Sequence, residues 1–525
     1  MNKNKAEIVQ PIISKTIWRL LFGVLLLLLT ICMIRPCFQN DTFYIIKLGE
    51  QLLDKGIVLN DYWAWSAQLV NTYPHFLLNL IFALLYRSFG FFGIYVFVLV
   101  IGYAFSLSLY YMIEKTYDSA AGNKNPSLYP LVGTIVSVIV IVVFPTFILA
   151  RSQLITYPLW LWEAWFILCF LNSGKKRYAI AIIVIAWLCA LVHATAWYFT
   201  FILFLPFFAS VIVTRLGTFI SSRNIDAGFI IQNEKFILSN ENECSNSKKL
   251  LLIMLISYAT GLLTPTRLCY TSVFKASSGI TINYIAEHQP LVLAEMKYVL
   301  IGLLLFIVLM SVIKSRCRLD LLFLFGGTFV MSVMSKRHVG LLVFLGWFAL
   351  FYLLFSIIRF IPAILKNRLS MTVTAIIIPI AFLILGIANN NITPFYFFDS
   401  SFVSAEAIDY LEENYDAQQL RLFNSYSYGA YMLFRDIPVF IDSRVNEYTQ
   451  EFDPSLDRDV LNDYLTVISL DSNWREVVDY YDFDGYYISK NTALYEILLM
   501  SPDVEIVWEN DTMVIFMAVG NTKAK

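Results

Sequence analysis

Two aspartates follow the first long apolar run of the chain, and their setting suits them to act on a hydroxyl group. Asp41 lies directly after that run, and Asp61 lies further along the same segment, beside Tyr62 and Trp63. A partly desolvated carboxylate at a membrane surface can accept a proton as a general base, and the neighbouring aromatic rings are suited to stacking on a sugar. The simpler interpretation of Asp41 is the N-cap of a helix over Thr42–Leu53, and the two roles are compatible. For Asp61 the simpler interpretation is a solvated loop residue.

Further ionisable residues stand at the ends of other apolar runs, on one predicted side of the membrane. They are Arg151, His75, His193, Glu287, His288, Lys336, Arg337 and His338. Ionisable groups at membrane depth cost roughly 2.5–3.5 kcal/mol each, so they usually face a polar cavity. Arg151, Lys336 and Arg337 together could hold a phosphate, although such residues also anchor a helix among lipid headgroups. An interfacial histidine and a solvated loop remain the alternatives for His193 and for Glu287-His288.

The composition indicates the elements that must position these residues. Of the 525 residues, 58% are hydrophobic and 15% are charged, whereas soluble domains average about 25% charged residues. Most of the chain therefore belongs in lipid. The seven cysteines lack C-x-x-C spacing, which indicates neither a zinc site nor a disulfide framework. No basic and aromatic stripe of the kind that binds nucleic acid is present.

Apolar runs of about 20 residues predict membrane-spanning helices. Eleven are expected, at 17–34, 91–112, 128–149, 155–171, 178–192, 195–213, 250–263, 298–313, 319–334, 339–358 and 369–388. The segment 75–87 is too short to cross and is predicted to lie at the outer surface. This topology places 20 of the 30 basic residues of the membrane part on the cytoplasmic side, as the positive-inside rule requires. We therefore expect a multi-pass protein of the cytoplasmic membrane with its N-terminus in the cytoplasm and its C-terminal part outside.

Charge divides the chain into two predicted domains. Residues 1–388 carry 30 Lys and Arg against 15 Asp and Glu, whereas residues 389–525 carry 8 against 24. The first domain is predicted to be transmembrane, with long outer loops at 35–90 and 264–297. The second is predicted to be an extracytoplasmic α/β domain. Its expected strands are 421–424, 439–442 and 485–489, its helices are 405–415, 460–470, 474–481 and 493–500, and a hairpin over 504–508 and 513–518 closes it. Within it, Gly429 suggests a close-packing position and Asp442 with Arg444 a local ion pair.

The order of short motifs along the chain resembles a known superfamily. These motifs include Asp41-Thr42-Phe43, Arg151-Ser152-Gln153, Val192-His193-Ala194, Glu287-His288-Gln289-Pro290, Lys336-Arg337-His338, Tyr428-Gly429-Ala430-Tyr431 and Asp442-Ser443-Arg444. In this order and with this layout of spans, the chain resembles the bacterial GT-C fold membrane glycosyltransferases, the superfamily of protein O-mannosyltransferases and aminoarabinose lipid A transferases. It is most similar to a subgroup with a C-terminal extracytoplasmic domain.

The resemblance implies an α-helical, polytopic membrane glycosyltransferase with an inverting reaction. The donor would be a sugar on a polyprenyl phosphate, and the acceptor an extracytoplasmic glycan, lipid or protein of the cell envelope. Asp41 would be the general base, with Asp61 as a second acidic residue. Arg151, Lys336 and Arg337 would stabilise the departing phosphate, and the four histidines and Glu287 would line the substrate site. A divalent metal is optional, because a phosphate already leaves well.

Two other classes of function remain open on the sequence. A non-catalytic member would keep the fold as a scaffold or lipid-binding component of envelope polysaccharide assembly. A secondary transporter would need polar residues or helix breaks deep within paired spans. The expected spans are apolar at mid-depth, with their polar groups at one end, and this pattern favours chemistry at the membrane surface.

Overall fold

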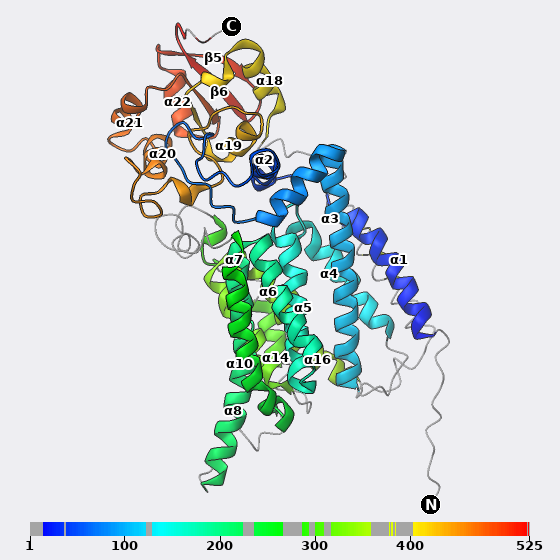
Figure 1. The fold of residues 1–525 in the computed structure, drawn as a ribbon. Coiled ribbons are helices and arrows are strands. Elements are labelled where there is room, and N and C mark those ends of the chain that lie inside the picture. The colour runs from blue at the N-terminus through cyan, green and yellow to red at the C-terminus, as the bar shows by residue number, and fades with distance from the viewer. Residues whose placement is uncertain are drawn as a thin grey trace, which may run out of the picture.

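The computed structural model describes most of the chain. The described residues are 14–35, 38–121, 129–223, 236–265, 286–292, 300–308, 317–358 and 403–521, with Ile377, Ile380, Ala381, Ile384 and Lys523. They form a helical bundle that carries a mixed α/β part at one end (Figure 1).

The bundle is built from long apolar helices. They are α1 (Lys15–Met33), α3 (Phe76–Ala121), α4 (Tyr129–Phe147), α5 (Gln153–Ser173), α6 (Lys176–Val192), α7 (Ala194–Ile202), α8 (Leu205–Ser222), α10 (Glu241–Leu262), α14 (Leu319–Met334), α15 (Val339–Leu341), the π-helical η5 (Leu342–Gly346) and α16 (Phe348–Ile358). Many of their large apolar side chains remain exposed on the outer faces of α1, α3 and α8. Such faces are stable only in lipid, so the bundle is a membrane part.

Six stretches of the described chain are long and apolar enough to cross a membrane. They are Lys15–Met33, Phe76–Ser119, Tyr129–Phe147, Gln153–Ser173, Ala194–Ser222 and Lys336–Ser356, with α14 as a shorter apolar helix. The predicted spans at 178–192 and 250–263 coincide with α6 and α10. The span at 298–313 is described over residues 300–308, and the span at 369–388 lies largely outside the described residues. The structure therefore shows a mostly helical membrane protein and leaves the count of eleven spans as a prediction.

Helix α3 is two helices joined at Gly90. This glycine has φ of 62° and ψ of −155°, a conformation that is essentially restricted to glycine. Residues 76–89 run obliquely across the end of the bundle before the chain turns down into the span (Figure 1). The short segment 75–87, which was predicted to be separate from the span at 91–112, is therefore helical and runs in a different direction from that span.

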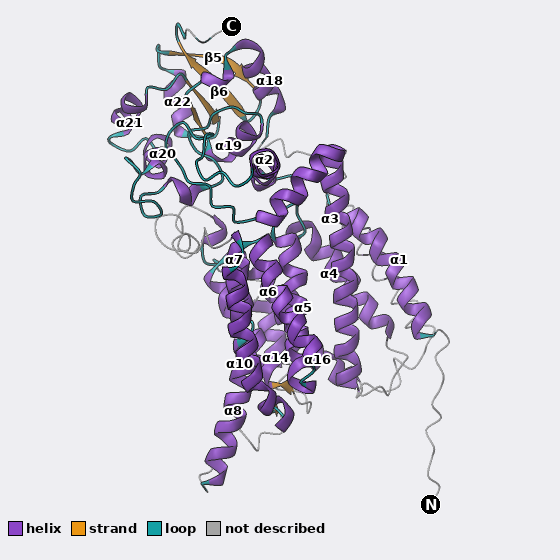
Figure 2. Cartoon of the chain, viewed as in Figure 1, coloured by secondary structure: helices purple, strands orange, loops and turns teal. Residues whose placement is uncertain are grey.

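The C-terminal part contains a four-stranded sheet with the order β3-β4-β6-β5. Its strands are β3 (Leu422–Asn424), β4 (Gly485–Ser489), β5 (Val504–Glu509) and β6 (Met513–Ala518). β3 and β4 are parallel, and β6 is antiparallel to both β4 and β5. Helices α18 (Ala405–Asn414), α19 (Tyr426–Phe434), α20 (Val460–Ile468), α21 (Trp474–Tyr481) and α22 (Ala493–Leu499) surround the sheet (Figure 2).

One predicted strand pairs elsewhere. The segment 439–442 does not join the sheet, because Val439 forms a parallel bridge with Ala64 of the first outer loop. Its backbone accepts a hydrogen bond from Trp65 N at 3.0 Å and donates one to Trp63 O at 2.9 Å. The extended conformation of 439–442 was predicted from its residue types, but the strand partner is Ala64, in the outer loop between α2 and α3.

The α/β part packs directly on helix α2 (Asn40–Lys55). Phe43 of α2 contacts the rings of Tyr431 and Phe434 at centroid distances of 5.0 and 5.5 Å, and Lys47 pairs with Asp436 at 2.6 Å. Gly429 of α19 confirms the close-packing prediction, since a Cβ there would collide with the backbone of Ile441 and Asp442. Helix α2 is thus held between the bundle and the α/β part.

Candidate active site

Asp41 lies in the first turn of α2 and faces the turn between α4 and α5. The helix begins at Asn40 with Gln39 as its N-cap, so the prediction that Asp41 caps a helix at Thr42 is wrong. Its carboxylate instead accepts hydrogen bonds from Nε and Nη2 of Arg151 at 2.8 and 2.6 Å. The hydroxyl of Thr42 donates to Ala150 O at 2.9 Å, which fixes the helix end against this turn.

A second carboxylate holds the other side of the Arg151 guanidinium. Nη1 of Arg151 donates to Oε1 of Glu287 at 2.9 Å. The side chains of Asp41 and Glu287 are 37% and 47% exposed, so both can be reached from outside the protein. Charge-assisted pairs of this fork geometry are strong and directional. Three segments far apart in the sequence therefore converge on one guanidinium.

Lys336, Arg337 and His338 form a short 3-10 turn, η4 (Lys336–His338), directly after α14. The backbone N–H of Lys336 donates to Gln289 O at 3.1 Å, and the hydroxyl of Ser335 donates to Glu287 O at 3.0 Å. This turn therefore positions the η3 segment (Ala286–His288) beside Arg151.

Arg337 reaches two histidines. Its Nη1 lies 3.4 Å from Nε2 of His288, and its Nη2 lies 3.5 Å from Nε2 of His193. A guanidinium can only donate, so both ring nitrogens act as acceptors and both imidazoles are neutral. His338 instead has its Nδ1 3.2 Å from Met331 O and packs its ring on Phe199.

His75 completes the group on the bundle side. Its ring lies 4.9 Å from the ring of His193 between centroids, and its Nδ1 is 3.3 Å from Val192 O. His193 stands at the break between α6 and α7, with Thr195 Oγ1 2.5 Å from its Nε2. The sequence placed these residues at one membrane level, and the structure brings them together.

Electrostatics set the charge state of the group. Burial would raise the pKa of Asp41, but the charge and hydrogen bonds of Arg151 outweigh it and hold that pKa below its ordinary value. Burial lowers the pKa of His75 and of His288 to about 4, and the Arg337 cation acts in the same direction on both. At neutral pH Asp41 is therefore ionised and both histidines are uncharged.

A cavity of about 270 Å³ opens beside this cluster. Arg151, Lys336 and Arg337 line it together with Glu287, Tyr157 and the apolar residues Phe147 and Leu149. The lining combines three cations with apolar side chains from the end of α4. Such a lining suits an anionic headgroup that carries an apolar tail.

The arrangement does not suit a divalent cation. Within the described residues, no group of three or more His, Cys, Asp or Glu side chains could hold a metal ion. The carboxylates of Asp41 and Glu287, which would be the natural ligands, converge on Arg151 instead. We therefore derive no step through a metal.

Asp61 does not lie with Asp41. Its side chain is fully buried, and it pairs with Nη1 of Arg444 from the α/β part at 2.8 Å. Its other oxygen accepts a hydrogen bond from Trp63 N at 2.9 Å. In contrast to the predicted catalytic role, this placement favours a structural role, because a buried and paired carboxylate is closed to a substrate hydroxyl.

Arg444 is the centre of a buried ionic cluster between the first outer loop and the α/β part. The predicted pair with Asp442 is confirmed, with Nε of Arg444 2.9 Å from the Asp442 carboxylate. Glu447 lies 3.7 Å from the same guanidinium and accepts a hydrogen bond from Thr72 at 2.8 Å. One cation thus faces three carboxylates at this junction, from Asp61, Asp442 and Glu447.

Glu447 should make the stability of this junction depend on pH. Burial raises the pKa of Glu447 from 4.5 to about 7, although Arg444 opposes the shift. Because the folded pKa lies above the ordinary value, the neutral form contributes stability that is complete below about pH 4.5 and is lost as pH rises through about 7. We expect Glu447→Gln to flatten the decline of Tm between about pH 5 and pH 8. Glu509→Gln, which changes an exposed partner of Lys490, is the control, and equal slopes in both variants would contradict the assignment.

One buried acid was missed by the sequence reasoning. Glu163 lies within α5, its side chain is fully buried, and neither carboxylate oxygen has a hydrogen-bond partner among the described residues. The expectation that the spans are apolar at mid-depth is therefore wrong for α5. The sequence feature that could have revealed this buried acid is the single acidic residue between Trp162 and Ala164, in the middle of an apolar run.

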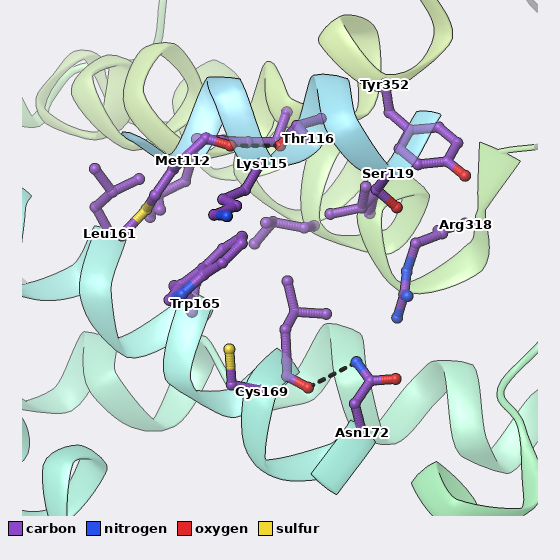
Figure 3. A pocket seen from close by; sticks show the side chains of 16 residues that line it. Met112, Lys115, Thr116, Ser119, Leu161, Trp165, Cys169, Asn172, Arg318 and Tyr352 are labelled. Atoms are coloured by element: carbon purple, nitrogen blue, oxygen red, sulfur yellow. Dashed lines mark hydrogen bonds between the residues drawn. The ribbon is translucent and has the colours of Figure 1, made fainter. Parts of the chain in front are cut away.

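A different cavity lies at the opposite end of the bundle. It has a volume of about 180 Å³, and its lining is mainly apolar. Lys115 of α3 and Arg318 point into it from opposite sides (Figure 3). Arg318 is held by Asp320 and Glu243 at 2.7 and 3.0 Å. Two carboxylates therefore neutralise the cation of Arg318, and their side chains are nearly buried, whereas the two carboxylates on Arg151 are partly exposed.

No family model and no curated protein matches the sequence. Among solved structures, the chain is similar to the oligosaccharyltransferase of Archaeoglobus fulgidus in the apo form, with a TM-score of 0.55 at 11% identity over 91% of this chain and 70% of that one. The oligosaccharyltransferase AglB from the same organism, in complex with an inhibitory peptide and a dolichol-phosphate, gives a TM-score of 0.55 at 10% identity over 90% and 70%. ArnT from Cupriavidus metallidurans bound to undecaprenyl phosphate gives a TM-score of 0.48 at 10% identity over 97% and 99%.

The two matches at TM-score 0.55 extend over nine tenths of the chain and define its fold. The chain has the GT-C fold, and the fold expected from the resemblance in the sequence is confirmed. At this level of identity the likeness concerns the fold.

Proposed function

We propose that the chain is an inverting glycosyltransferase of the cytoplasmic membrane that moves a sugar from a polyprenyl-phosphate donor to an acceptor hydroxyl outside the cell. The observation that carries the proposal is the position of Arg151 between Asp41 and Glu287, at the mouth of a cavity also lined by Lys336 and Arg337. The GT-C fold supports it, and AglB, which shares that fold, was solved with a dolichol-phosphate.

The donor phosphate would enter the cavity beside Arg151. Its oxygens would meet three cations at the level where a lipid-linked phosphate is presented, while the lipid tail would leave past the apolar end of α4. Arg151 would then share its hydrogen bonds between the phosphate and the carboxylates. Because Arg151 lowers the pKa of Asp41 in the free protein, this competition would raise that pKa and make the carboxylate a better base.

Chemistry then follows in a single displacement. The acceptor hydroxyl attacks the anomeric carbon and transfers its proton to Asp41. The bond between that carbon and the phosphate oxygen breaks, and the electron pair leaves with the lipid phosphate. Arg151, Lys336 and Arg337 stabilise the charge that develops on the leaving group. One displacement inverts the anomeric centre.

Arg151→Ala should weaken donor binding. The variant loses a fork of charge-assisted hydrogen bonds, each worth about 1.5–3 kcal/mol, so we expect the apparent KM for a polyprenyl-phosphate sugar to rise roughly 10–100-fold. Initial rates of purified protein at increasing donor concentration measure it. Arg87→Ala is a matched control, since Arg87 pairs with Asp54, an exposed carboxylate of α2. An unchanged KM in Arg151→Ala would contradict the phosphate site, and the absence of any transfer by the wild-type protein would favour a non-catalytic scaffold.

A further inference from the structure

A polar cavity of about 500 Å³ lies apart from the candidate active site, between the first outer loop and the α/β part. One wall is the loop segment 60–70, and the other consists of residues 453–460 with the end of α21. In Figure 1 these tail elements lie on the side of α20 and α21. The volume falls within the range of roughly 300–1,000 Å³ that ligand pockets occupy.

Two tyrosine rings are presented at this cavity. Tyr62 is 74% exposed and Tyr480 is 56% exposed, although aromatic rings are usually buried. The guanidinium of Arg458 stacks 4.5 Å from the centroid of Tyr480 and is fixed in turn by Asp463, with contacts of 2.6 and 2.8 Å. Arg458 therefore stacks on the Tyr480 ring, while more than half of the Tyr480 side chain stays exposed and able to stack on a ligand.

The charged groups of the lining are mainly carboxylates. Asp453 and Asp457 line the cavity with a single cation, Arg458, whereas the carboxylate of Asp61 in the same wall is buried against Arg444. This balance disfavours phosphates and other anions, which separates the cavity from the cation-lined one beside Arg151. Asp457 is exposed, and within the described residues it forms no ion pair. Carboxylates together with stacking rings are the chemistry that binds the hydroxyls and the apolar faces of a neutral sugar.

A series of side-chain contacts links the cavity to α2, the helix that carries Asp41. Asp61 in its wall pairs with Arg444 at 2.8 Å, and the guanidinium of Arg444 lies 5.2 Å from the ring of Tyr44. Tyr44 stands one turn after Asp41 on α2, so the two side chains share one side of that helix. Burial raises the pKa of Tyr426 of α19, and the negative charge of Glu287 acts in the same direction.

We propose that this cavity binds a neutral saccharide, and that this saccharide is part of the acceptor. The inference rests on the proposed function and names the chemical class of its acceptor. Tyr62 and Tyr480 provide the stacking rings, and Asp457 accepts hydrogen bonds from sugar hydroxyls.

The test measures binding separately from transfer. The full chain is placed in lipid nanodiscs, because maltoside detergents would themselves offer sugars. Neutral trisaccharides of glucose, galactose, mannose and N-acetylglucosamine are then titrated by saturation-transfer difference NMR. We expect at least one to bind, and Tyr480→Ala or Asp457→Asn to weaken it by roughly 10-fold or more, as loss of a stacking ring or a key acceptor typically does. Met500→Ala and Asp511→Asn, exposed positions away from the cavity, should leave it unchanged.

Three results would overturn the inference. These are the absence of binding by every neutral trisaccharide, binding that survives the combined Tyr62→Ala and Tyr480→Ala change, and preferential binding of trilysine or trigalacturonate. Saccharide binding that persists in Asp41→Asn while wild-type protein transfers no sugar would leave this site intact and remove the proposed function. Sugar transfer by a protein whose cavity binds no saccharide would leave the proposed function intact and overturn the saccharide site.

Discussion

Replacement of Asp41 by Asn is expected to lower sugar transfer about 10²–10⁴-fold, the usual contribution of a general base. Asn keeps the size of the side chain and can still accept a hydrogen bond from Arg151, so the first turn of α2 should remain in place. Donor binding should persist, because Arg151, Lys336 and Arg337 are unchanged. The loss should therefore appear in kcat at saturating donor.

Asp54→Asn provides a matched control for this variant. Asp54 is an exposed carboxylate on the same helix and is also paired with an arginine, Arg87, at 2.6 Å. Its replacement should leave both kcat and KM near the wild-type values. Near-normal turnover in Asp41→Asn would remove Asp41 as the base and leave its pairing with Arg151 as a structural contact.

Replacement of Arg444 by Met should produce the largest loss of stability. The change leaves the carboxylates of Asp61, Asp442 and Glu447 buried without their shared cation. Removing one partner of a buried ionic group typically costs about 3–5 kcal/mol, and we expect this loss as a lower Tm of the full chain in nanodiscs. Lys490→Met should have a small effect, because its pair with Glu509 is open to solvent.

A second substitution separates the loss of charge balance from the loss of packing. Asp61→Asn, combined with Arg444→Met, removes one of the unpaired charges and should restore part of the lost Tm. If the double variant is no more stable than Arg444→Met alone, the loss reflects packing around the arginine, and the ionic explanation of this junction is wrong.

The sequence predicted the parts of the fold that depend on local pattern. Apolar runs located the helices of the bundle, and the strands at 485–489 and in the closing hairpin follow from alternating residues. Helix α19 was not predicted, because Tyr426–Phe434 is rich in aromatic residues with little preference for helix. Its helical form is stabilised by packing on α2, which a local pattern does not reveal.

The candidate site was predictable as far as charge placement allows. Arg151, Arg337, His193 and Glu287 were assigned to one membrane level because they lie at the ends of predicted spans or in outer loops on one side of the membrane. The structure brings them together. The partner of Asp61 was not predictable, since Arg444 lies far along the chain and the contact depends on how the α/β part packs. Glu163 was overlooked because one acid does not interrupt an apolar run.

The most direct test of the proposed function is a structure of the full chain in nanodiscs with added undecaprenyl phosphate. We expect the phosphate to lie within hydrogen-bond distance of Arg151 and of Lys336 or Arg337, with the Arg151 contact to Asp41 lengthened or lost. A phosphate bound instead at the opposite end of the bundle, beside Lys115 and Arg318, or a cavity beside Arg151 that stays empty at saturating lipid, would contradict it.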